Sequence, residues 1–165
     1  MSSRQIGKQK QPFHTYKTLR LQVIPVSPSE AETPLQIVCF FDQTKNEIPA
    51  KKLLLIGLGD PDKFSAQVMR AVGHVAMNEA VKLGVSSFSF APSIKDAGVS
   101  SVPAGDVSTL LTEGMLKAYN SAATLVERGL MSALEVNEII FLAGAAHIAD
   151  SQAGLAKAIK ANSHR

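Results

Sequence analysis

Apolar residues occur along the chain in two patterns: short alternating or continuous runs, and longer stretches with a period of three to four residues. The short runs predict strands at 19–25, 37–41, 53–57, 87–91 and 138–142. The longer stretches predict helices at 61–83, from a cap at Asp106 or Ser108 to 125, and from a cap at Asp150 to 159. This order favours a three-layer α/β/α domain, in which helices cover both faces of a mixed sheet.

The strand at 53–57 is followed at once by the first predicted helix, with a Gly57-Leu-Gly59 turn between them. Asp60 is expected to cap this helix and Pro61 to occupy its first position, because proline has no N–H group to leave unpaired. Gly84 provides a left-handed residue at which the helix can end. The residues expected on its inward face are Phe64, Val68, Ala71, Val72 and Val75.

Met69, Met77 and Val81 lie outside that face and form a second apolar patch on the same helix. Soluble monomers usually keep exposed apolar area small, so such a patch either meets a partner or is covered by the chain itself. The sequence leaves these two interpretations equally open. If the first one holds, the patch is an interface and predicts a homo-oligomer.

The second predicted helix carries mostly small residues on its expected inward face, which consists of Val107, Leu111, Gly114, Ala118, Ala122 and Leu125. Gly114 is the most informative of these, because glycine in a helix interior costs up to about 1 kcal/mol relative to alanine. Its presence predicts a close contact between this helix and the sheet.

Composition limits the number of domains and the compartment. With 165 residues and 45% hydrophobic content, the chain can bury one core. No apolar run approaches the roughly 18 residues of a membrane span, and the first residues lack the hydrophobic centre of a secretory signal. The single cysteine, Cys39, lies in an apolar run and has no partner for an internal disulfide. We therefore expect a cytoplasmic protein.

Positive charge is concentrated at the start of the chain. The net charge is +3, and residues 1–20 contain five Lys and Arg residues and no acid. Residues 1–18 are expected to form a basic disordered tail, followed by a single domain at 19–161. The charge of this tail suits nucleic acid, but no aromatic residue lies among the charges of residues 1–11 for base stacking, so a solvated tail is favoured.

Few residues point to chemistry. The four histidines show no metal-ligand spacing and the acids are scattered, so no metal, cofactor or catalytic residue is expected. Gly57, Gly59 and Asp60, together with Gly144 after the last strand, form a candidate ligand-binding site, because a glycine turn before a helix can present N–H groups to a phosphate. The third glycine of a dinucleotide fingerprint is missing, and a turn alone explains the first two glycines.

Four segments occur in an order and spacing that point to a known family. They are Leu-Leu-Leu-Ile-Gly-Leu-Gly at 53–59, the helix ending in Lys82-Leu83-Gly84, the strand at 88–90, and Glu113-Gly-x-x-x-x-Tyr119. Together they resemble the N-terminal domain of the leucine (cytosol) aminopeptidase family, and the similarity covers residues 19–160. The chain departs from the family after Tyr119, where Asn-Ser-Ala-Ala-Thr replaces an aromatic and basic continuation.

The resemblance implies a macrodomain-like fold without peptidase chemistry. In that family a separate C-terminal domain holds two metal ions and carries an Asn-Thr-Asp-Ala-Glu-Gly-Arg signature, which does not occur here. We therefore expect a non-enzymatic, stand-alone domain without the catalytic domain, acting as an interaction, assembly or regulatory module. Its expected partners are copies of itself or an aminopeptidase-like chain.

Two alternatives stay open. The first is a nucleotide-binding domain that takes ADP-ribose-like ligands through the loops after Ile56 and Leu142, which calorimetry with ADP-ribose would identify. The second is the non-catalytic half of a split aminopeptidase, which a catalytic domain encoded beside this chain would favour.

Overall fold

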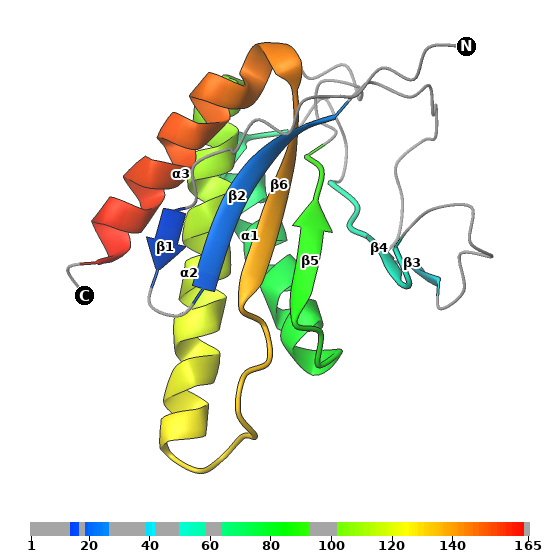
Figure 1. Cartoon of the computed structure of the whole chain (residues 1–165), viewed down its shortest axis with the longest axis vertical. Helices are drawn as coiled ribbons and strands as arrows, with labels where there is room; N and C mark the ends of the chain where they lie inside the picture. The colour runs from blue at the N-terminus through cyan, green and yellow to red at the C-terminus, as the bar shows by residue number, and fades with distance from the viewer. Residues whose placement is uncertain are drawn as a thin grey trace, which may run out of the picture.

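The computed structural model describes residues 14–16, 19–26, 39–41, 50–58, 64–92 and 102–163, and it describes side chains from residue 50 onward within these ranges. Strands and helices alternate in the second half of the chain (Figure 1). The elements are β1 (His14–Tyr16), β2 (Leu19–Val26), β3 (Cys39–Phe41), β4 (Leu53–Leu55), α1 (Ala66–Lys82), β5 (Ser87–Phe90), α2 (Ala104–Glu127), β6 (Glu138–Gly144), the 3-10 turn η2 (Ala145–His147) and α3 (Ile148–Asn162).

The described strands form a four-stranded sheet in the order β1-β2-β6-β5 and a separate antiparallel pair of β3 and β4. In the larger sheet β6 is parallel to both β2 and β5, whereas β1 is antiparallel to β2. Phe141 of β6 lies opposite Val23 of β2 and Phe90 of β5. The predicted mixed α/β character is therefore confirmed.

Strand β1 was not expected from the sequence, since it lies within the segment predicted to be a tail at 1–18. Its three residues pair with the start of β2, so this part of the prediction is wrong. Backbone hydrogen bonds to β2 explain this strand. An edge strand can form through such bonds even when its own sequence has no apolar alternation. The rest of the predicted tail is outside the described residues.

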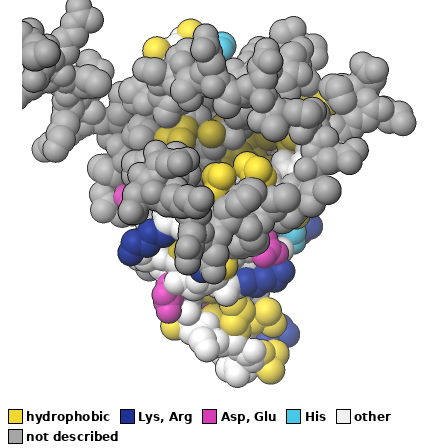
Figure 2. Space-filling view, turned by 90° about the vertical axis from the view of Figure 1, so that its right-hand side faces the viewer, with side chains coloured by type: hydrophobic (Ala, Val, Ile, Leu, Met, Phe, Trp, Pro, Cys, Tyr) yellow, Lys and Arg dark blue, Asp and Glu magenta, His cyan; other side chains and the backbone are white. Residues whose placement is uncertain are grey.

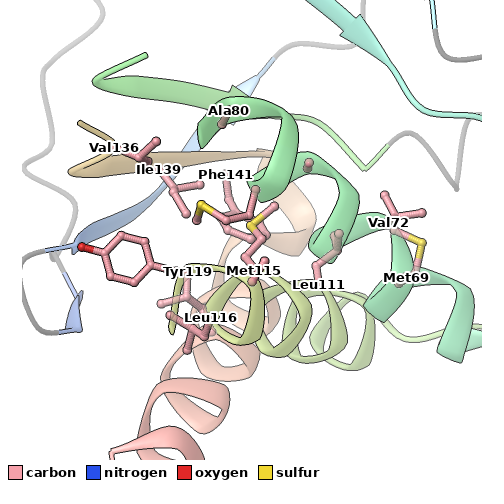
Figure 3. Packing of buried hydrophobic residues seen from close by; sticks show 14 of the residues in the cluster. Met69, Val72, Ala80, Leu111, Met115, Leu116, Tyr119, Val136, Ile139 and Phe141 are labelled. Carbon is pink, nitrogen blue, oxygen red and sulfur yellow. The ribbon is translucent and has the colours of Figure 1, made fainter. Parts of the chain in front are cut away.

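The three described helices pack on one face of the larger sheet. The hydrophobic core joins residues of α1, α2 and α3 to alternate residues of the strands, namely Phe88 and Phe90 of β5 and Ile139 and Phe141 of β6. Figure 3 shows Ile139 and Phe141 turned toward Met115 of α2. Because side chains alternate along a strand, these residues mark a single face. A second helical layer, as predicted for the other face, is not found among the described residues.

Helix α1 begins five residues later than predicted. Its N-cap is Ser65, which has an extended backbone, and Asp60 and Pro61 lie outside the described residues. The C-terminal end agrees with the prediction, because Gly84 has a φ of 59°. The N–H groups of Gly84 and Val85 donate to the carbonyls of Val81 and Ala80, which is the Schellman arrangement that closes a helix.

The predicted caps of the other two helices are wrong. The N-cap of α2 is Pro103, and that of α3 is His147. Asp106 and Asp150 instead lie in the first turns of these helices, where a negative charge is favourable to the helix dipole. Ser108 lies inside α2, and its hydroxyl donates to the carbonyl of Gly105 at 3.0 Å.

The inward face of α2 is predicted correctly except at its end. Val107, Leu111, Gly114, Ala118 and Ala122 are buried, whereas the side chain of Leu125 is 41% exposed. The last turn of α2 projects beyond α3 and the sheet in Figure 1, so it has no neighbouring element to pack against among those described.

Helices α1 and α2 touch backbone to backbone where two glycines meet. A Cβ atom on Gly114 would lie 2.0 Å from the carbonyl oxygen of Arg70, and one on Gly73 would lie 2.1 Å from that of Leu111. Gly114 therefore makes the close contact that the sequence predicts, but with α1 rather than with the sheet. At the edge of this crossing the Arg70 Nε donates to Glu113 at 3.1 Å.

Helices α2 and α3 approach each other equally closely. A Cβ atom on Gly154 of α3 would lie 2.1 Å from the carbonyl oxygen of Gly105. The hydroxyl of Thr109 lies 2.7 Å from the carbonyl oxygen of Gly105 and 3.1 Å from that of Gly154, so it links the two helices. Thr112, one turn further along, is fully buried and its hydroxyl has no hydrogen-bond partner within the part of the chain that is described.

The Gly114→Ala variant distinguishes two opposite effects on stability, that of helix propensity and that of packing. Propensity alone would stabilise the protein by about 1 kcal/mol. We expect a loss of about 1 to 3 kcal/mol instead, because the added methyl group must push the two backbones apart. Ser121→Ala, at an exposed position of the same helix, should change the free energy of unfolding by less than about 0.5 kcal/mol. Urea denaturation measures both, and a Gly114→Ala variant more stable than the natural chain would contradict the contact.

Two threonines of α2, Thr109 and Thr112, form a second matched pair. Thr109→Val removes a hydroxyl that is bonded across the α2–α3 contact and should destabilise the protein by about 1 kcal/mol. Thr112→Val removes an unpaired hydroxyl from the core, so the same chemical change should be neutral or stabilising. Thermal unfolding measures the stability of both variants. An equal loss in the two would contradict the assignment of a bonded hydroxyl to Thr109 and an unpaired one to Thr112.

Candidate functional site

Two of the four residues predicted to bind a ligand, Gly57 and Gly144, are among the described residues. Gly57 is exposed and follows β4 of the two-stranded sheet, whereas Gly144 is half-buried at the end of β6 in the larger sheet. Gly144 ends its strand, as predicted, and leads into η2. Gly59 and Asp60 lie outside the described residues.

The apolar patch predicted as an interface belongs to the core instead. Met69, labelled in Figure 3, is 1% exposed and Met77 is 0% exposed. Val81 is half-buried against the same core. Ala71, expected to point inward, is exposed. The predicted inward face is confirmed at Phe64, Val68 and Val72, which belong to the core or pack against it. The buried face also includes the methionines, because α1 packs closely against α2 at Gly73. The alternative in which the chain itself covers the patch is the one observed.

A shallow hollow of about 360 Å³ lies between the first turns of α2 and α3. It is lined by Pro103, Gly105, Asp106, Thr109, Asp150, Ala153, Gly154 and Lys157. Gly105 and Gly154 carry no side chain, which lets the two helix backbones approach closely at the bottom of the hollow. The hydroxyl of Thr109 is already bonded to backbone carbonyls. The two carboxylates suit the helix N-termini, so helix packing explains this hollow.

Exposed apolar residues gather instead at the end of α2, in a region that we call the α2 tip and define as residues 125–135. The side chains of Leu125 and Leu130 are 41% and 72% exposed. Val126, Met131 and Leu134 are half-buried there. Figure 2 shows hydrophobic side chains grouped with basic ones at the lower end of the molecule, where this tip lies in Figure 1.

The shape of the α2 tip is fixed by its backbone. Gly129 has a φ of 69°, and its N–H group donates to the carbonyl of Val126 at 2.9 Å. The N–H group of Leu130 donates to the carbonyl of Leu125, also at 2.9 Å. This is a second Schellman arrangement, in which the residues before and after the turn are commonly apolar and in contact. It accounts for an apolar residue at both leucine positions, but it leaves Leu130 largely in solvent.

A second hollow, of about 180 Å³, lies beside this turn. It is lined by Val81, Gly84, Met131, Ser132, Ala133, Leu134 and Glu135. Its walls combine apolar side chains with the polar side chains of Ser132 and Glu135, and Glu135 stands exposed at the position facing Gly84. The sequence analysis missed this site. The signal available was Leu130-Met131 directly after Gly129, because connecting segments at a surface are usually polar.

Of the predicted ligand-binding glycines, the two that are described, Gly57 and Gly144, line neither of these hollows. Metal binding finds no support in the described residues either, which contain no group of three or more His, Cys, Asp and Glu side chains placed to hold an ion. None of the described helices has the length and apolar character needed to cross a bilayer.

Comparison of the chain with protein-family models, with curated proteins and with solved structures found no match.

Lysine substitutions test whether the methionine patch is core. Met69→Lys or Met77→Lys would bury an unpaired ammonium group, so each should cost several kcal/mol and unfold much of the population. Ala71→Lys, at an exposed position of the same helix, should leave the melting temperature nearly unchanged. Circular dichroism on the three variants checks this. A folded Met77→Lys protein of normal stability would contradict the burial of the patch.

Proposed function

We propose that this chain is a cytoplasmic, non-catalytic assembly module related to the N-terminal domain of the leucine aminopeptidase family, and that it associates with copies of itself. The order of the strands and helices from 53 to 162 supports this relationship, because β4, α1, β5, α2, β6 and α3 follow one another at the spacing on which the resemblance rests. The proposed full arrangement is macrodomain-like and three-layered. The parallel β5-α2-β6 unit is compatible with it.

The exposed leucines of the α2 tip carry the assembly proposal. Single exposed apolar residues are ordinary on protein surfaces, but a cluster of them on a projecting element is typical of an interaction site. Leu125 and Leu130 lie together at the end of a helix that extends past its neighbours. Burial of Leu130 alone would contribute about 1.5 to 3 kcal/mol to association.

Sedimentation velocity of the full chain over a wide dilution series tests assembly directly. We expect the average sedimentation coefficient to rise with concentration, because two small apolar surfaces give a weak, reversible complex rather than a permanent one. Natural chain that sediments as a monomer up to millimolar concentration would contradict the proposed function.

A further inference from the structure

We propose that two copies of this chain associate through their α2 tips, with Leu130 of each copy inserted into the 180 Å³ hollow of the other. The inference rests on the proposed function and adds the surface, the partner and the geometry. Four features of the α2 tip lead to it: a protruding apolar side chain, a hollow of matching chemistry, a pair of complementary charges, and a rigid backbone that presents them.

Leu130 is the protruding side chain. It is 72% exposed, the largest exposed fraction among the big hydrophobic residues of the described chain. The left-handed Gly129 and the two backbone bonds at 2.9 Å fix the backbone that carries it. Because this backbone is already ordered, little backbone freedom is lost on binding, which favours Leu130 as an anchor.

The hollow next to it matches this side chain. Its apolar walls are Val81, Met131 and Leu134, of which Val81 and Leu134 also pack against the core. A volume of 180 Å³ exceeds several-fold the space that one water molecule needs, so the side-chain carbons of a leucine fit. A leucine side chain that packs against these three residues removes apolar surface of both partners from water.

Leu130 and the hollow each have a charged residue nearby, and the two charges have opposite signs. Arg128 lies two residues before Leu130, and Glu135 lines the hollow. Both residues are exposed, and within the described chain neither side chain takes part in an ion pair. When Leu130 enters the hollow of a second copy, Arg128 approaches the Glu135 of that copy. Complementary charges at the rim of an interface favour the correct partner and register.

The same tip carries both the protruding residue and the hollow, which selects a second copy as the occupant. In a two-fold arrangement every contact is made twice, since residue i of one copy meets residue j of the other and the reverse. Two Leu130 insertions and two Arg128–Glu135 pairs then close the complex at a dimer. The contact area is small, so the dimer should be in rapid exchange with the monomer.

A leucine pair provides the first test, with sedimentation velocity on the full chain as the readout. Leu130→Asp should weaken association by at least about tenfold, because a charge would have to enter the apolar hollow. Leu55→Asp alters another exposed leucine, 46% exposed in β4, and should leave association unchanged. Circular dichroism confirms that both variants are folded. If a folded Leu130→Asp variant associates as strongly as the natural chain, the α2 tip is not the interface, but the proposed assembly function still holds. If the natural chain is itself monomeric, the assembly function is wrong.

Charge reversal provides the second test and does not depend on the leucine. Arg128→Glu alone places two glutamates opposite each other at each rim of a two-fold dimer, and Glu135→Arg alone places two arginines there. Each variant by itself should therefore associate more weakly than the natural chain. An equimolar mixture of the two should recover association, because in the mixed dimer both rims again pair one glutamate with one arginine. A mixture that behaves as the average of its components would overturn the proposed register.

Discussion

The backbones of α1 and α2 meet at Gly73 and Gly114, and this contact determines how the helix layer covers the sheet. At each site the carbonyl oxygen of the other helix occupies the space of a side chain. Gly154 repeats the arrangement between α3 and α2. Helices that approach so closely can form one compact layer over β5, β6 and β2. The side chains of Leu111, Met115 and Phe141 then meet in a single core below it.

The position of the α2 tip follows from this layer. The crossing at Gly114 lies near the middle of a 24-residue helix, so the C-terminal part of α2 continues past the elements that it packs against. No residue of α2 beyond Ala122 is buried. The helix is nevertheless closed by an ordered turn at Gly129, and the following residues return to β6. A rigid apolar projection is the outcome, and it is the part of the described chain best suited to meet another molecule.

Local sequence signals located most elements but not their mutual packing. The order of strands and helices, the stop at Gly84 and the close contact at Gly114 follow from periodicity and glycine conformation. Helix starts were misplaced because Asp60, Asp106 and Asp150 are good caps by residue type, whereas the observed N-caps make no side-chain capping bond. The buried face of α1 depends on α2, a partner that single-helix periodicity does not contain. Strand β1 depends similarly on its neighbour β2.

The candidate site was the least predictable part. Leu125 satisfies the period of an inward face. It is exposed only because the end of α2 extends past the helices and strands that the helix packs against. Leu130, Arg128 and Glu135 become a set only because the chain turns at Gly129 and the residues that follow pass beside the end of α1. Two of the four residues expected to bind a ligand, Gly59 and Asp60, lie outside the described residues. Of the other two, Gly57 follows β4 of the smaller sheet and Gly144 ends β6 of the larger one.

Amide hydrogen exchange at low and high protein concentration tests self-association through the α2 tip most directly. The account predicts that protection rises with concentration at residues 125–135 and at the end of α1 around Val81 and Gly84, while the exchange of β5, β6 and α3 stays the same. Concentration-dependent protection confined to another surface, or exchange at the tip that is independent of concentration, would contradict it.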